Sequence, residues 1–278
     1  MTEVLRQPGR VGATVSDWWV ITKRNLITYI RKPDLLVFST IQPVMFVLLF
    51  VYVFGGTFDR LLPPSVQYVD FLMPGIFVQT AIFASTQTGV GLADDLQKGL
   101  IDRFRSLPMA RSAVLAGRTA ADTVSVAIQT VLMLIVAYLV GYRFHEGIAE
   151  ALLAFVGVVS VGYAFTWVSA FAGLSLKTIE AVQAALFTVV FPFVFVSTAF
   201  VPLALFPDWL QPFVAHNPVT IWVDTVRVLT LGELYSPDTS KLFANIQSLG
   251  TLLWLSVLWF AGFLVVFSFL GVRVYRRT

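Results

Sequence analysis

The chain has 278 residues, of which 57% are hydrophobic and only 13% are charged, and it contains no cysteine. A soluble domain carries about 25% charged residues, and a single soluble core could not hide the apolar surface of 25 Phe and 7 Trp side chains. These figures exclude a water-soluble globular enzyme, a disulfide framework and a zinc–thiolate site, and a net charge of +3 is too small to indicate a nucleic-acid partner. The sequence therefore predicts an integral membrane protein.

The first predicted element is an amphipathic helix at residues 14–32, within a cytoplasmic N-terminal region of residues 1–34. Apolar side chains alternate there with cations, which is typical of a helix that lies in the membrane interface with tryptophans at headgroup depth. A surface anchor is the simpler interpretation, and contact with a cytoplasmic partner is the alternative. The residues that we assign to this interfacial helix are Trp18, Trp19, Lys23, Arg24 and Arg31.

Six apolar segments follow, each about long enough to cross the bilayer as a helix, for which about 20 residues are needed. None of them carries an Asp, Glu, Lys or Arg in its middle. They are residues 35–56, 71–93, 123–141, 148–173, 181–201 and 249–271. The predicted fold class is therefore all-α integral membrane, with one six-span transmembrane domain over residues 35–271 and a cytoplasmic tail at 272–278.

The distribution of Lys and Arg predicts the orientation of these spans. Fifteen of them lie in the two terminal regions and in the connections between spans two and three and between spans four and five, and four lie in the remaining connections. Because cytoplasmic loops carry the excess of Lys and Arg, both termini are expected in the cytoplasm of a multi-pass cell-membrane protein.

The connection at residues 94–112 is the most charged stretch of the chain. Leu100, Phe104 and Leu107 repeat at four and three residues, which predicts a short helix with one apolar stripe. A solvated loop would explain the arginines but not the stripe, so we expect a helix that docks in a groove of another protein. The residues assigned to this docking helix are Gly99, Leu100, Asp102, Arg103, Phe104, Arg105, Leu107, Pro108 and Met109.

The segment at residues 202–247 is too apolar for a free outer loop. Asn217 followed by Pro218 predicts a helix start, with Asn as the cap and Pro in the first turn. Roughly fourteen residues follow before the next glycine, which is too short for a span, so we expect a re-entrant helical hairpin that enters from the outside. Asp224 and Arg227 lie three apart on this helix and can neutralise each other.

Uncharged polar and small residues occur inside the spans. A Gln in hydrocarbon needs a partner, so these side chains should face other helices or a cavity, and as a set they suit a wide pathway for a large, mostly apolar substrate. Packing between helices is the simpler interpretation for any single residue. Ala81, Ser85 and Gly89 form a small-residue ladder that permits close helix contact.

No catalytic or metal-binding pattern is found in the sequence. His145 and His216 are isolated, and no G-x-x-x-x-G-K-[ST] phosphate loop occurs. Arg118 and Asp122, four residues apart, form a pair that satisfies itself rather than a proton relay. We therefore expect a chain that is not an enzyme and binds no cofactor, with any ATP and Mg held by a separate ATPase chain.

Two segments resemble those of a known family, the type 2 ABC-transporter permeases, and in particular its daunorubicin-resistance branch. They are Gly-Leu-Ile-Asp-Arg-Phe-Arg-Ser-Leu-Pro-Met at residues 99–109 and Pro-Asp-Trp-Leu-Gln-Pro-Phe-Val-Ala-His-Asn-Pro-Val at residues 207–219. The resemblance implies that residues 94–112 form a coupling helix in a groove of a nucleotide-binding ATPase subunit. It also implies an exporter of two permease chains, identical or related, and two ATPase chains, with the first, second and fifth spans along the substrate path. The residues assigned to that path are Gln42, Phe46, Gln79, Phe83, Gln87, Phe191 and Phe195.

The resemblance implies export of a hydrophobic or amphipathic drug, polyketide or lipid from the cytoplasm or inner leaflet, in contact with membrane lipids. Export of a lipid-linked polysaccharide is the nearest alternative. An ion-coupled secondary transporter is less consistent with spans that lack a central charge. A membrane-embedded enzyme and a structural scaffold remain the other classes.

Overall fold

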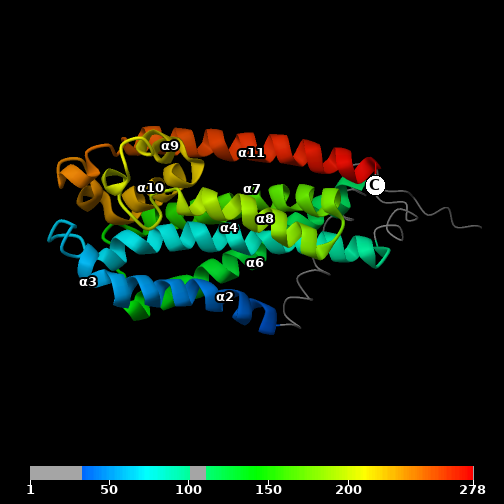
Figure 1. Cartoon of the computed structure of the whole chain (residues 1–278), viewed down its shortest axis with the longest axis horizontal. Coiled ribbons are helices and arrows are strands. Elements are labelled where there is room, and N and C mark those ends of the chain that lie inside the picture. The colour runs from blue at the N-terminus through cyan, green and yellow to red at the C-terminus, as the bar shows by residue number, and fades with distance from the viewer. Residues whose placement is uncertain (1–32, 101–110, 278) are drawn as a thin grey trace, which may run out of the picture.

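The computed structural model describes residues 33–100 and 111–277 of the chain. All regular secondary structure in these residues is helical, and the long helices run side by side along one axis (Figure 1). The interfacial helix expected at residues 14–32 lies outside the described residues. The same holds for most of the expected docking helix, namely Asp102, Arg103, Phe104, Arg105, Leu107, Pro108 and Met109.

Within residues 33–100 and 111–277, five helices are long and apolar enough to cross a membrane, which agrees with the expected all-helical membrane protein. The first is continuous through α2 (Pro33–Leu48), the π-helical segment η1 (Leu49–Phe54) and α3 (Gly55–Phe58). The others are α4 (Tyr68–Gln97), α6 (Arg111–Val140), α7 (Ile148–Leu176) and α11 (Leu249–Arg277).

The expected fifth span corresponds to a shorter helix, α8 (Ile179–Phe195), which has 17 residues and ends well before residue 201. Its end is capped from another part of the chain, because the side-chain amide of Asn217 donates to the carbonyls of Phe193 and Val196 at 2.8 and 2.6 Å. The expected third span is longer than anticipated, since α6 begins at Arg111 rather than at residue 123.

The expected outer segment contains η2 (Leu203–Leu205), α9 (Gln211–His216), α10 (Pro218–Leu231), η3 (Gly232–Tyr235) and η4 (Lys241–Phe243). Asn217 caps α10 as predicted, since its side-chain oxygen accepts from the amide of Val219 at 2.9 Å. Most of α10 is buried, and it packs against α4, α7 and α11.

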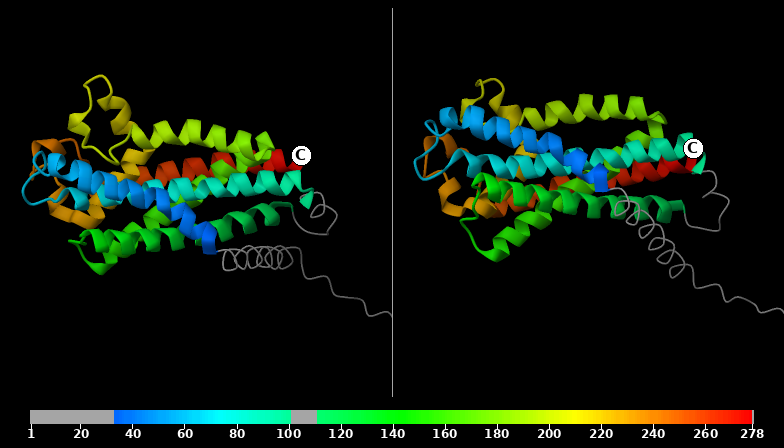
Figure 2. Two further views of the ribbon diagram at one scale, coloured as in Figure 1. Left: turned by 60° about the horizontal axis from the view of Figure 1, so that its bottom comes forward. Right: turned by 90° about the horizontal axis from the view of Figure 1, so that it is seen from below.

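Helix α4 forms the centre of the bundle and lies between α6 and α8 (Figure 2). The predicted small-residue ladder on α4 faces α7, where the backbones come close together. A Cβ atom added at Gly89 would lie 2.4 Å from the carbonyl oxygen of Ser169, and one added at Gly173 would lie 2.3 Å from the carbonyl oxygen of Gly89. This spacing is possible only because neither glycine has a side chain.

The two ends of the bundle differ. The connection between α6 and α7, the helices α9 and α10 and the loop after α3 gather at one end, and the end of α4, the start of α6 and the last turn of α11 lie at the other (Figure 1). We call these the α10 end and the Gly99 end. Large apolar side chains are exposed on the outside of the bundle, among them Trp254, Val265 and Phe269 of α11. An apolar surface of this kind is stable in lipid or against another apolar protein.

Candidate functional site

A polar cavity of about 140 Å³ lies between α2, α4 and α6. It brings together four of the residues that the sequence assigns to the substrate path, and it adds Gln129, one of the other uncharged polar residues inside the predicted spans. The lining includes Gln42, Gln79, Thr80, Phe83, Gln87 and Gln129. Three helices far apart in sequence therefore contribute amide side chains to one space.

The wall of this polar cavity contains buried oxygens that lack a hydrogen-bond partner. Gln79 is only 2% exposed, and its Oε1 accepts no hydrogen bond from the described residues; the same is true of the hydroxyl of Thr80. Gln129, in contrast, donates from Nε2 to the hydroxyl of Ser125 at 3.3 Å. Because an unsatisfied buried polar group costs about 1–3 kcal/mol, a water or a ligand that donates to Gln79 would be stabilised there.

The other expected path residues belong to a set of stacked rings between α2, η1, α8 and the chain after α8. We call Phe46, Phe50, Phe191, Phe195 and Phe200 the aromatic ladder. The ring centroids of Phe191 and Phe195 are 4.1 Å apart, those of Phe195 and Phe200 are 4.9 Å apart, and those of Phe50 and Phe200 are 4.8 Å apart. Phe46 joins through Phe195 at 5.9 Å.

Phe50 and Phe200 belong to this ladder but were not predicted from the sequence. Phe46 and Phe50 are four residues apart, as are Phe191 and Phe195, so the helical spacing already predicts a row of rings on each helix. Phe200, however, lies beyond the end of α8 and reaches the ladder only because the chain turns back there. Since Gln42 lies one helical turn before Phe46, the polar cavity and the aromatic ladder adjoin on α2.

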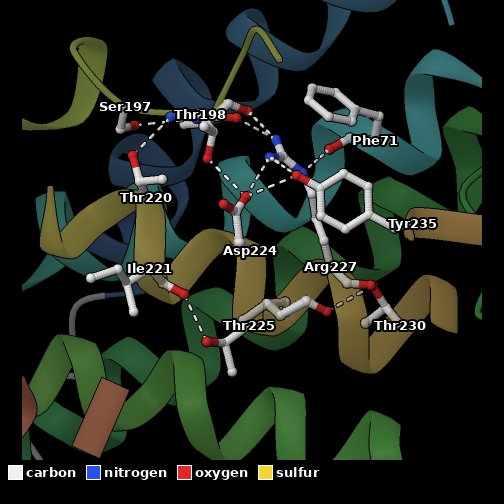
Figure 3. Close-up of polar contacts among 12 residues, drawn as sticks. Phe71, Ser197, Thr198, Thr220, Ile221, Asp224, Thr225, Arg227, Thr230 and Tyr235 are labelled. Carbon is white, nitrogen blue, oxygen red and sulfur yellow. Dashed lines mark hydrogen bonds and ion pairs between the residues drawn. The ribbon is translucent and has the colours of Figure 1, made fainter. Parts of the chain in front are cut away.

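A buried polar cluster at the α10 end holds Arg227 (Figure 3). This side chain is 0% exposed and pairs with Asp224 at 3.1 Å, which confirms the predicted neutralisation. Its guanidinium also donates to the carbonyls of Phe71, Thr198 and Ala199 at 2.8, 2.5 and 3.1 Å. Arg227 therefore joins α10 to α4 and to the chain that follows α8.

Asp224 completes this cluster by accepting three hydrogen bonds at one oxygen. The donors to Oδ1 are Arg227, the hydroxyl of Thr198 at 2.9 Å and the hydroxyl of Tyr235 at 3.0 Å. Burial, together with the neighbouring Asp224 carboxylate, raises the pKa of the Tyr235 phenol, so the hydroxyl remains protonated and acts as the donor. The geometry is that of a closed structural cluster.

At the Gly99 end, Arg118 connects the two helices that flank residues 101–110. It lies 2.5 Å from the carboxylate of Asp95 on α4 and 3.4 Å from that of Asp122 on α6. The predicted pair of Arg118 with Asp122 is present, and Asp95 adds a contact between helices that the residue spacing does not predict.

The last turn of α4 ends in a left-handed residue. Gly99 has φ of +66°, and its amide donates to the carbonyl of Leu96 at 3.0 Å, a conformation that glycine adopts without a steric penalty. The hydrogen bond from Lys98 to Asp94, 2.6 Å long, raises the pKa of the exposed Lys98. Gly99 and Leu100 are the members of the expected docking helix that the structure describes.

Residues 33–100 and 111–277 contain no group of three or more His, Asp or Glu side chains that could hold a metal ion. The nearest approach of a histidine to a carboxylate there is His145 to Asp70, at 3.8 Å. The polar cavity and the aromatic ladder offer amides, hydroxyls and aromatic rings to a ligand.

Comparison with known proteins identifies similar chains. The family described as "ABC-2 type transporter" matches residues 16–231. The daunorubicin resistance ABC transporter permease protein DrrB1 of Streptomyces coeruleorubidus is 29% identical over 96% of this chain and 87% of its own length. The probable doxorubicin resistance ABC transporter permease protein DrrC of Mycobacterium tuberculosis is 28% identical over 82% of each chain. The putative transport permease ycf38 of Cyanophora paradoxa is 27% identical over 77% of this chain and 74% of its own length.

Proposed function

The chain belongs to the ABC-2 type transporter family, and we propose that it is the membrane-spanning half of an exporter for amphipathic, ring-containing small molecules or lipids. It is a permease subunit without catalytic activity, and ATP hydrolysis belongs to a separate ATPase subunit. Two permease chains, identical or related, and two ATPase chains form the proposed exporter, with ATP and Mg bound on the ATPase chains.

The proposed substrate class is inferred from the polar cavity and the aromatic ladder, which lie next to each other. A planar apolar body can stack on Phe195 and Phe200, where offset aromatic contacts contribute about 0.5–1.5 kcal/mol each. A hydroxyl or amine on the same molecule can donate to the unpartnered Oε1 of Gln79. These two requirements describe an amphipathic molecule with rings and a few polar groups, which includes the drugs named for the daunorubicin and doxorubicin relatives.

In the proposed arrangement α8 crosses the membrane as the fifth of six spans, both termini are cytoplasmic, and the α10 end faces outward in the cell membrane. The excess of Lys and Arg in the terminal regions and in the connection at residues 94–112 supports this orientation. Residues 202–247 then form the outer segment with a re-entrant α10, and residues 14–32 lie along the inner surface.

In this proposal, residues 94–112 bind in a groove of the ATPase and transmit its conformational change to the permease. Arg118 ties the Asp95 turn of α4 to α6, so a displacement of the docked segment moves both helices together. Helix α4 carries Gln79 and Phe83, and this movement would change the access to the polar cavity from either side. Substrate entry is proposed from the cytoplasm or the inner leaflet.

The test is drug-stimulated ATPase activity of the permease reconstituted with its ATPase partner in proteoliposomes, with daunorubicin as the probe. Gln79→Leu should raise the half-maximal drug concentration about tenfold, which corresponds to about 1.4 kcal/mol of lost binding. Phe195→Ala should weaken binding similarly because it removes the central ring of the ladder. The matched control is Gln183→Leu, an exposed glutamine of α8 that does not line the cavity.

Basal ATPase activity should be unchanged in all three variants. Unaltered daunorubicin stimulation in both Gln79→Leu and Phe195→Ala would contradict the proposed site. Transport that persists without the ATPase partner would instead favour the ion-coupled alternative, and stimulation by lipid-linked polysaccharide but not by daunorubicin would favour the polysaccharide exporter.

A further inference from the structure

A second recess, separate from the polar cavity, lies between α6 and α7 near the α10 end. Its volume is about 430 Å³, within the range of about 300–1,000 Å³ found for small-molecule pockets. We call it the α6–α7 recess. Its walls are formed chiefly by Leu134 and Tyr138 of α6, Ala151 and Leu152 of α7, and Phe77 of α4.

The inside of the α6–α7 recess offers no free hydrogen-bond donor from its threonines. Thr130 donates its hydroxyl to the carbonyl of Val126 at 2.9 Å, and Thr230 donates to the carbonyl of Val226 at 2.9 Å. Most of the other lining residues are aliphatic or aromatic. An occupant of the interior is therefore a hydrocarbon chain rather than a polar group.

The recess has a buried floor and an open apolar rim. Val158 on the floor is 1% exposed, whereas Ile148 and Leu152 on the rim are 82% and 60% exposed. These are positions of α7, one of the helices apolar and long enough to span the membrane. An opening with so apolar a rim on such a helix is suited to the acyl chains of a bilayer.

A cation, Arg143, is held beside Tyr138 and Phe144, which line the recess. Arg143 donates from Nη1 to the carbonyls of Tyr138 and Tyr142 at 2.9 and 2.7 Å, and its guanidinium lies 5.4 Å from the centre of the Tyr138 ring, which lines the recess. The backbone amide of Arg143 is anchored to the carboxylate of Asp70 at 3.0 Å. The side chain is exposed, and within the described chain its Nε and Nη2 donate to nothing.

This combination points to a lipid with a phosphate group. Arginine binds phosphate through paired N–H donors, and two of its nitrogens are available beside a hydrocarbon-lined recess. Glu150 lies in the same turn of α7 as Ile148 and Ala151, and it disfavours a headgroup with net negative charge. A zwitterionic phospholipid fits the apolar recess, Arg143 and Glu150 together. Its acyl chain can enter the recess and its phosphate can bind Arg143, while its amine remains near Glu150.

The α6–α7 recess is distinct from the polar cavity proposed for substrate. Phe77 faces the recess and Gln79 faces the polar cavity. Residues two apart on an α-helix project about 200° apart, so the two sites lie on opposite faces of α4. A molecule in one does not occupy the other.

We propose that the α6–α7 recess is a binding site for a zwitterionic phospholipid of the leaflet at the α10 end, with one acyl chain in the recess and the phosphate on Arg143. The bound chain would fill the space between α6 and α7 and hold the two helices at a fixed separation. The proposal does not depend on the substrate assigned to the polar cavity.

Native mass spectrometry of the full chain with its ATPase partner tests this site. The probes are dioleoyl-phosphatidylethanolamine and dioleoylglycerol, which share acyl chains and differ in the headgroup. We expect the wild-type protein to retain the phospholipid at least fivefold more than the glyceride. Arg143→Gln should abolish this preference, and Ala151→Trp, which fills the recess, should reduce retention of both lipids at least fivefold.

The matched control is Ala261→Trp, which places the same side chain on an exposed position of α11 and should leave retention unchanged. Wild-type retention in both Arg143→Gln and Ala151→Trp would overturn the proposal. Displacement of the retained lipid by daunorubicin would also overturn it, because the recess would then belong to the drug path. Gln79→Leu separates the two proposals, since it should impair drug stimulation and leave lipid retention unchanged.

Discussion

The guanidinium of Arg227 lies 3.7 Å from the centre of the Phe71 ring, although the two residues are 156 positions apart in the chain. The same guanidinium binds the carbonyls of Phe71, Thr198 and Ala199, so its positive charge is shared among three segments. A fully buried arginine side chain needs several hydrogen-bond acceptors of this kind, because an isolated buried charge is strongly destabilising.

Arg227→Met should therefore destabilise the protein by about 3–5 kcal/mol, since Asp224, whose side chain is only 13% exposed, is left without its counter-charge. Thermal unfolding of the detergent-solubilised protein would measure this loss. The double variant Arg227→Met, Asp224→Leu should lose less than the sum of the two single variants, because no unpaired charge remains. Arg60→Met removes an exposed arginine and serves as the control. Additive single and double effects would show that the two charges are not coupled.

Two glycines of α7 should respond in opposite ways to the same substitution. Gly173→Ala inserts a Cβ atom 2.3 Å from the carbonyl oxygen of Gly89, so α4 and α7 must separate and stability should fall by about 1–3 kcal/mol. Gly157→Ala adds a Cβ atom with no neighbour within 4 Å and should raise stability by about 0.5–1 kcal/mol through helix propensity. Comparison of their melting temperatures in detergent checks the pair, and equal shifts would contradict the close packing of α4 on α7.

Arg118→Met should reduce drug stimulation of ATPase activity without preventing assembly. The substitution removes the link from α4 to α6 at the Gly99 end, and a coupling free energy of about 1–3 kcal/mol corresponds to a loss of roughly 5–150-fold. The measurement compares basal with daunorubicin-stimulated hydrolysis in proteoliposomes. Arg273→Met, an exposed arginine near the end of α11, is the matched control. If daunorubicin stimulates ATP hydrolysis fully in Arg118→Met, Arg118 does not contribute to the coupling.

Gly99→Ala should weaken the interaction of the permease with its ATPase. A non-glycine residue at φ of +66° costs about 1–2 kcal/mol, and the chain relieves this cost by changing the direction in which it leaves α4. Titration of the purified ATPase onto the permease should give a several-fold weaker apparent affinity. Gly56→Ala, at a position with an ordinary φ and open space, should have no such effect.

Phe104→Asp should abolish co-purification of the ATPase while membrane insertion is retained. The charge would lie in the middle of the apolar stripe formed with Leu100 and Leu107, which is expected to bury in the partner's groove. Pull-down from solubilised membranes measures the association, and membrane fractionation measures the insertion. An ATPase that still co-purifies with this variant would refute the docking assignment of residues 94–112.

Local patterns in the sequence predicted the helices and the contacts within them. The period and length of apolar segments located α4, α7 and α11, and the Asn217–Pro218 pair located the start of α10. Arg227 and Asp224 are neighbours on one helical face, so their pairing also followed from spacing alone.

Contacts between distant segments were not predictable in this way. The partners of Arg227 at Thr198 and Ala199 exist because the chain turns immediately after α8, and the spacing of apolar residues gives no signal for that turn. The contact of Arg118 with Asp95 and the place of Phe200 in the aromatic ladder depend equally on how whole helices pack. The polar cavity was expected only as a set of amides, and packing of α2, α4 and α6 gave it a location.

The shortness of α8 has a consequence for the surrounding lipid. Its 17 residues extend about 26 Å, whereas the hydrocarbon core of a typical membrane is about 30 Å thick and the neighbouring α7 has 29 residues. If α8 crosses the membrane as we propose, the bilayer must thin beside it or the helix must draw polar flanking groups inward. Export should then depend on acyl-chain length, with an optimum in bilayers thinner than the average, and cholesterol-like thickening agents should slow it.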